Sequence, residues 1–129
     1  MPLYHRGFRS VLVLLGLVIV GTALADIAMG PSILPGSPEV TPTLDSNYRF
    51  FAGIWCAIGI TMLAAAWKTG LHVHGVRVVC GAVFLGGLTR TVSYLAAGAP
   101  HAVFVVGIGV ELLVPPLLLL WSARVHREP

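Results

Sequence analysis

The stretch FRSVLVLLGLVIVGTALADIAM, residues 8–29, carries the strongest structural signal in this sequence. Its only charged residues are Arg9 near the start and Asp26 near the end. A helix of this length, rising 1.5 Å per residue, is long enough to cross a hydrocarbon core of roughly 30 Å. Because lipid offers the backbone no hydrogen-bond partner, the stretch is predicted to be a transmembrane helix.

The same stretch also imitates a secretory signal peptide. Arg6 and Arg9 flank the start of the apolar run, and Ala23-Leu24-Ala25 resembles the small-residue cleavage site of such peptides. The apolar run continues beyond that point to Met29. We therefore expect the segment to be retained as a helix.

Three further apolar runs follow, at about residues 47–67, 76–97 and 102–121. The linkers between them are short, so consecutive helices are expected to be antiparallel neighbours. The chain has 129 residues, of which 10% are charged, whereas soluble domains carry about 25% charged residues. We predict an all-α membrane protein, a four-transmembrane-helix antiparallel bundle that forms a single domain over residues 1–129.

The segment between the first two runs, residues 30–46, differs in composition because it contains four prolines. Proline fixes φ and removes a backbone donor, so this segment is predicted to be an irregular loop. Asp45 or Ser46 is the predicted N-cap of the helix that follows.

Most basic residues lie at the ends of the apolar runs. Six of them fall in the N-terminal segment, in or beside the second linker, or in the C-terminal tail: Arg6, Arg9, Lys68, Arg77, Arg124 and Arg127. The segments at 30–46 and 98–101 carry none. The positive-inside rule therefore predicts that both termini are cytoplasmic and that the proline-rich loop is external. The net charge of +3 does not indicate a nucleic-acid partner, because no basic stripe with interleaved aromatic residues exists.

Four ionisable residues lie within the apolar runs: Asp26, Arg49, Arg90 and Glu111. Charges inside a membrane are costly, usually face the interior of the bundle and tend to pair. Their depths, counted at helical rise from the helix ends, place all four in the outer half. The depths predict the pairs Arg90–Glu111 and Asp26–Arg49. Small residues share the faces of these charges, as expected where helix backbones approach closely.

Two interpretations of the charges remain open. In the first, the pairs only lock the helices together, because buried pairs fix register more than they stabilise a fold. In the second, they form an outward-facing polar pocket that is also lined by Asn47, Tyr48, Tyr94 and His101. No nucleophile, metal cluster or paired histidine accompanies the charges, so no catalytic residue, metal site or cofactor is predicted.

Short motifs in the last three runs and in the turn between the third and fourth resemble those of a known family. They are SNYRFFAG at 46–53, TRTVS at 89–93, GAP at 98–100 and the lone Glu111. On these motifs, nearly the whole chain resembles the bacterial four-helix membrane proteins grouped as domain of unknown function 4345. The resemblance implies four helices and a location in the bacterial inner membrane. It implies no activity.

Three functions are compatible with these features. The first is an accessory or structural subunit of a larger membrane complex, such as an envelope lipid transporter or a respiratory assembly. It is favoured by the small cytoplasmic loops and the many small residues. The second is a binder or carrier of a small or lipidic ligand in the polar pocket. The third and weakest is a membrane enzyme that uses Glu111 as an acid or base. Expected partners are membrane lipids and other membrane-protein subunits.

Overall fold

The computed structural model describes residues 3–125. Within this range, the side chains of residues 3, 4, 43, 46, 47, 50, 69–72, 93, 96 and 97 are not described. The described chain forms four long helices and one short 3-10 helix, in the order α1 (Leu3–Met29), η1 (Gly30–Ile33), α2 (Pro42–Ala65), α3 (Thr69–Ala97) and α4 (Ala102–Val125). The prediction of an all-α fold is confirmed.

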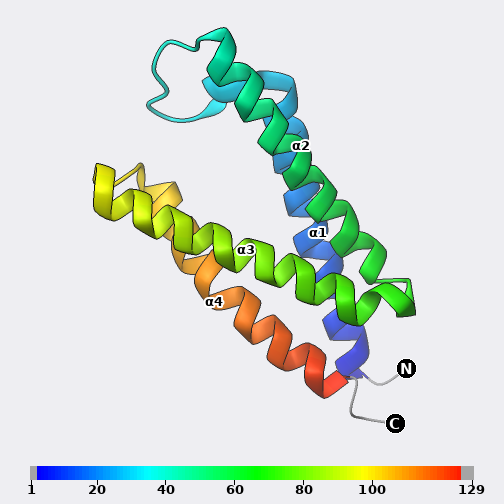
Figure 1. Cartoon of the computed structure of the whole chain (residues 1–129). Coiled ribbons are helices and arrows are strands. Elements are labelled where there is room, and N and C mark those ends of the chain that lie inside the picture. Colours follow the sequence, from blue (N-terminus) through cyan, green and yellow to red (C-terminus); the bar gives the residue numbers. More distant parts are fainter. Residues whose placement is uncertain (1–2, 126–129) are drawn as a thin grey trace.

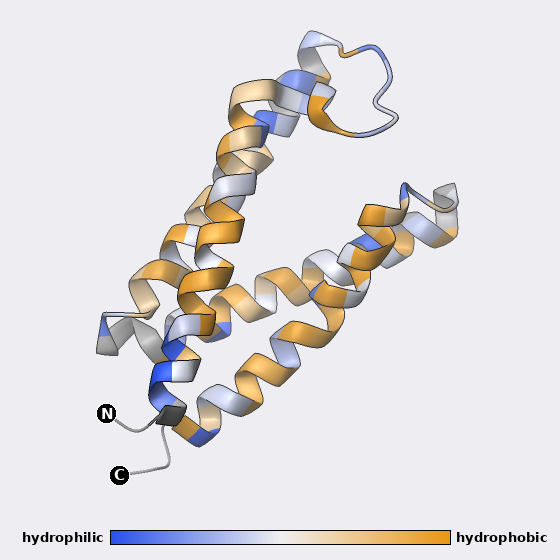
Figure 2. Ribbon diagram, turned by 180° about the vertical axis from the view of Figure 1, so that it is seen from behind, coloured by the Kyte–Doolittle hydropathy of each residue, from blue (hydrophilic) through white to orange (hydrophobic). Residues whose placement is uncertain are grey.

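The four helices form two antiparallel hairpins, α1 with α2 and α3 with α4 (Figure 1). The hairpins meet at the end of the molecule that carries both termini and the α2–α3 turn, which we call the closed end. They diverge toward the end that carries η1 and the α3–α4 turn, which we call the open end. The reverse view in Figure 2 shows the same V-shaped arrangement.

The hydrophobic core lies at the closed end and joins the two hairpins. Its buried members come from all four helices and the α2–α3 turn: Phe8, Leu12, Met62, Ala65, Ala66, Val76, Val79, Cys80, Leu118 and Val125. Phe8 and Leu12 are fully buried. The ring of Phe8 meets that of Trp121 edge-on, with centroids 5.5 Å apart. A shared core therefore holds α1 against α4 at the closed end.

Glycines bring the backbones of α1 and α2 together within their hairpin. A Cβ atom at Gly16 would lie 2.7 Å from Leu63 Cγ, and one at Gly59 would lie 2.9 Å from the backbone nitrogen of Val20. Neither position has room for a side chain. The two helices therefore pack as one unit, in the way that small residues allow between membrane helices.

The helix α2 begins earlier than the sequence predicted. Thr41 is its N-cap, since the Thr41 hydroxyl accepts a hydrogen bond from the Leu44 backbone N–H at 3.2 Å. The predicted N-cap at Asp45 or Ser46 is wrong. Pro42 lies in the first turn, where its missing N–H would have had no intrahelical acceptor, so proline is favourable there. Because η1 also forms, the irregular part of the loop is shorter than predicted.

Three helical segments are long and apolar enough to cross a membrane: His5–Ile33, Val73–Val92 and Ala102–Val125. In the described part of α2 the apolar stretch is the shorter Phe51–Ala65, which spans about 22 Å at helical rise. Before this stretch α2 carries polar residues, among them Asp45 and Arg49. Figure 2 shows hydrophobic residues along most of each helix. The chain is thus an all-α membrane bundle.

Candidate functional site

A cleft of about 770 Å³ lies between the two hairpins, in the open half of the molecule. Its walls come from both hairpins, which diverge in this region (Figure 1). The lining residues are Thr22, Asp26, Leu34, Tyr48, Phe51, Ala52, Trp55, Ile58, Ala82, Val83, Gly86, Thr89, Arg90, Phe104 and Glu111. The facing walls therefore belong to different hairpins.

The wall formed by α1 and α2 carries a carboxylate that is held by a tyrosine. The Tyr48 hydroxyl donates a hydrogen bond to Asp26 Oδ1 at 2.9 Å. One turn before Asp26, the Thr22 hydroxyl accepts a hydrogen bond from Trp55 Nε1 at 3.2 Å. The same hydroxyl contacts two backbone carbonyl oxygens of α1 at 3.0 Å. Two bonds between helices therefore orient these polar groups at the cleft.

The wall formed by α3 and α4 carries an ion pair. Arg90 Nε lies 3.1 Å from Glu111 Oε2, so the predicted pairing of these two residues is confirmed. The Arg90 guanidinium also lies over the Phe104 ring, 5.5 Å from its centroid. The side chain of Arg90 is 47% exposed and that of Glu111 only 17%. Glu111 Oε2 accepts no well-aligned hydrogen bond from the described residues, so charge attraction is what holds the pair.

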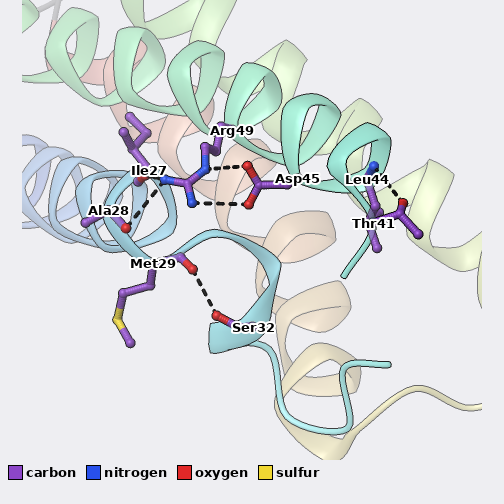
Figure 3. A network of polar contacts seen from close by, with 8 residues as sticks. All are labelled: Ile27, Ala28, Met29, Ser32, Thr41, Leu44, Asp45 and Arg49. Carbon is purple, nitrogen blue, oxygen red and sulfur yellow. Dashed lines mark hydrogen bonds and ion pairs between the residues drawn. The ribbon is translucent and has the colours of Figure 1, made fainter. Parts of the chain in front are cut away.

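The predicted Asp26–Arg49 pair is wrong, because Arg49 pairs with Asp45. Arg49 Nε lies 2.8 Å from Asp45 Oδ2 and Nη2 lies 3.1 Å from Oδ1 (Figure 3). Arg49 Nη1 donates to the backbone carbonyl oxygens of Ile27 and Ala28 near the end of α1. The early start of α2 places Asp45 one turn before Arg49 on the same helix face. The last carbonyls of α1 also lack intrahelical donors, so they accept from Arg49.

We use the name α1–α2 clamp for Asp45, Arg49 and the two backbone carbonyl groups that accept from Arg49. It explains the glycine that follows α1. Gly30 has φ +69°, and a Cβ atom there would lie 2.6 Å from Asp45 Oδ1 and 2.9 Å from Arg49 Nη2. Both backbone conformation and space therefore favour glycine. The clamp fixes the α1–α2 connection beside the cleft, and Arg49 is not one of the residues that line it.

The other predicted pocket residues lie outside the cleft or are not described. Tyr94 lines a neighbouring hollow of about 250 Å³ together with Arg90 and Phe104. His101 lines a third hollow, of about 450 Å³, between the proline-rich loop and the α3–α4 turn. The side chain of Asn47 lies outside the described residues. Of the predicted pocket residues, the cleft brings together Asp26, Tyr48, Arg90 and Glu111.

A smaller apolar pocket of about 190 Å³ adjoins the cleft, because Trp55, Val83 and Glu111 line both. The sequence analysis missed this pocket. Apolar residues surround a membrane helix on every side, so hydropathy does not distinguish those that line a cavity. One signal was available: tryptophan usually lies at the membrane interface, whereas Trp55 lies in the interior of α2.

The arrangement suits the non-covalent binding of a molecule that has a polar and an apolar part. The charged groups Asp26, Arg90 and Glu111 line the larger cleft, and Glu111 also lines the apolar pocket beside it. Among the described residues, no group of three or more His, Cys, Asp or Glu side chains is placed to hold a metal ion.

No curated protein and no solved structure matches this chain. The sequence profile of one family matches residues 7–122, a range that reaches all four helices. The match confirms the resemblance that the short motifs indicated. The chain belongs to the family described as domain of unknown function DUF4345.

Proposed function

We propose that this protein binds an amphipathic molecule of the membrane in the cleft between its two hairpins. The observation that carries the proposal is that an apolar pocket of about 190 Å³ adjoins a charged cleft of about 770 Å³ and shares three lining residues with it. A lipid-like molecule has a polar part that suits the charged cleft and an apolar part that suits the pocket. The volume of the cleft falls within the range of about 300–1,000 Å³ that is usual for ligand sites.

The placement of the charges supports this proposal. A charged side chain at the centre of a membrane helix costs roughly 2.5–3.5 kcal/mol. The cost is smaller toward the helix ends, but the cleft is lined by three charged residues of the apolar runs, Asp26, Arg90 and Glu111, and none of them belongs to the core at the closed end. Charges that line a cavity, rather than a packed core, are typical of a substrate or ion path.

The divergence of the hairpins supports entry of the ligand from the side. The core that joins the hairpins lies at the closed end. The hairpins are therefore not packed against each other at the open end. A molecule that already lies in the bilayer reaches the cleft by moving between the hairpins. Its apolar part then occupies the pocket lined by Leu15, Val79 and Leu118.

The proposed setting is the bacterial inner membrane, with both termini in the cytoplasm. The two termini and the α2–α3 turn share the closed end (Figure 1). Basic residues are concentrated in these parts of the chain, as the positive-inside rule requires of a cytoplasmic side: Arg6, Arg9, Lys68, Arg77 and Arg124. In this orientation the cleft opens in the outer leaflet.

A second candidate function is that of an accessory subunit in a larger membrane complex, such as an envelope lipid transporter or a respiratory assembly. Its support comes from glycines of α3 and α4 at the cleft and the pocket beside it at which a Cβ atom would meet nothing within 4 Å, namely Gly86 and Gly107. Small residues of this kind let a further helix approach closely. In this alternative, a transmembrane helix of a partner occupies the cleft.

The two candidates are separated by filling the cleft. Gly86 lines the cleft and has open space beside it, so Gly86→Phe places a ring in the cavity. Gly81, on the same helix, also has open space but does not line the cleft, which makes Gly81→Phe the matched control. Each protein is purified from its native membrane in mild detergent and its bound lipids and protein partners are identified by native mass spectrometry.

The ligand proposal expects lipid adducts on the wild-type protein and on Gly81→Phe, and their loss from Gly86→Phe. Equal lipid retention by all three proteins contradicts it. Larger chains that co-purify with the wild type and are lost from Gly86→Phe, without lipid adducts, favour the subunit function instead.

A further inference from the structure

We infer that the cleft selects a zwitterionic phospholipid head group, with its primary ammonium at Asp26 and its phosphate at Arg90. This inference rests on the proposed function and deepens it by naming the class of ligand. The two groups that carry it lie on facing walls, one on each hairpin, and line one continuous cavity.

Asp26 is the carboxylate in the cleft without a described cationic partner. Three ionisable residues of formal charge line the cavity, Arg90 with one positive charge and Asp26 and Glu111 with one negative charge each. Because Arg90 and Glu111 pair, the formal charge that remains is that of Asp26. Its described partner is the neutral Tyr48 hydroxyl, which donates to Oδ1. No described residue donates a hydrogen bond to Oδ2, so this oxygen can accept from a ligand ammonium.

Arg90 presents the complementary group. Its Nε faces Glu111, and its two terminal nitrogens make no hydrogen bond with the described residues. The guanidinium lies over the Phe104 ring, and the side chain is 47% exposed. A planar fork of N–H donors matches two oxygens of a phosphate. Such charge-assisted bonds are roughly twice as strong as neutral ones.

A zwitterionic head group pairs with the charged residues of both walls, Asp26 and Arg90, whereas a head group with a single charge pairs with only one of them. A purely anionic head group on Arg90 meets the negative charges of Asp26 and Glu111. A purely cationic one leaves the terminal nitrogens of Arg90 without an acceptor. A primary ammonium also donates N–H bonds to Asp26, which a quaternary ammonium lacks.

The test compares lipids that share one set of acyl chains and differ in the head group. Purified full-length protein in detergent is titrated with phosphatidylethanolamine, phosphatidylcholine and phosphatidylglycerol, and the bound fraction is read by native mass spectrometry. One charge-assisted hydrogen bond corresponds to about tenfold in affinity. We expect phosphatidylethanolamine to bind about tenfold more tightly than either of the others.

Variants assign the selectivity to Asp26. The amide oxygen of Asp26→Asn still accepts from Tyr48, so the fold is retained while the charge is lost. This variant is expected to bind phosphatidylethanolamine about tenfold more weakly and phosphatidylcholine, which donates no N–H bond to Asp26, less markedly so. Phosphatidylglycerol, whose anionic head group no longer meets the charge of Asp26, is expected to bind at least as tightly as before. Glu39→Gln, which removes an exposed carboxylate of the loop that does not line the cleft, is the matched control and is expected to change nothing. Thermal unfolding of each variant reports whether its fold is kept.

The outcomes distinguish this inference from the proposed function. Equal binding of the three lipids, abolished by Gly86→Phe, overturns the head-group assignment and leaves the binding function standing. A preference for phosphatidylcholine overturns the role of the primary ammonium. A uniform loss for all three lipids in Asp26→Asn shows that this residue acts on the fold and also overturns the inference. No lipid binding by the wild-type protein overturns both.

Discussion

Replacing Arg90 by leucine is expected to destabilise the fold more than replacing Glu111 by leucine, although the two form one ion pair. In Arg90→Leu the remaining charge is the Glu111 carboxylate, which is 17% exposed and has a buried Oε2. Removing one partner of a buried pair costs about 3–5 kcal/mol, and we expect a loss of about 3 kcal/mol. In Glu111→Leu the remaining charge is Arg90, which is 47% exposed. A long, partly exposed side chain can turn its charged end toward water, so the expected loss is about 1 kcal/mol.

The double variant is expected to lose about 2 kcal/mol, less than the sum of the two single effects, because it leaves no uncompensated charge. The measurement is reversible unfolding in mixed micelles with increasing sodium dodecyl sulfate, followed by far-ultraviolet circular dichroism. Arg77→Leu, at an exposed position of the same helix, is the control and is expected to change the free energy of unfolding by no more than about 0.5 kcal/mol. Strict additivity, or a larger loss for Glu111→Leu than for Arg90→Leu, would refute the reasoning.

Three further predictions concern orientation, the α1–α2 clamp and the core. In a cysteine-free background, a cysteine that replaces Ser37 is expected to react with an impermeant thiol reagent added outside intact cells, whereas one that replaces Thr69 is not. The reason is that basic residues mark the cytoplasmic side. The reverse labelling pattern contradicts the proposed orientation. Gly30→Ala is expected to lower the free energy of unfolding by at least about 1 kcal/mol more than Gly36→Ala. Both glycines have positive φ, but only the first faces clamp atoms closer than 3 Å, so equal losses in thermal unfolding would count against the clamp. Phe8→Ala removes a fully buried ring from the core and is expected to cost about 3–5 kcal/mol in the same unfolding assay; a loss below 1 kcal/mol would show that the closed end does not hold the hairpins together.

The sequence by itself determined the helical class and the Arg90–Glu111 pair. Hydropathy over a window of about twenty residues is a local property, and helical rise converts a residue number into a depth without knowledge of the neighbours. Arg90 and Glu111 lie at similar depth on helices that a short turn makes antiparallel. That relation was sufficient to pair them.

The same reasoning failed for Arg49, because depth alone does not specify the partner. Once Thr41 caps α2 and Pro42 occupies its first turn, Asp45 lies one turn before Arg49 and is nearer in space than Asp26. Capping is a matter of a few side-chain atoms. An error of a few residues in the predicted start of the helix therefore changed the predicted ion pair.

Only the tertiary structure decided where the cavity lies. The two hairpins share a core around Phe8 and Val79 at the closed end, and they diverge toward the open end (Figure 1). This divergence places Asp26 and Tyr48 opposite Arg90 and Glu111 across one cleft. The angle between two hairpins depends on side-chain packing over many residues, and an apolar side chain that faces lipid has the same hydropathy as one that lines a pocket. The charges of the site could thus be read from the chain, whereas the cleft between them arises from packing.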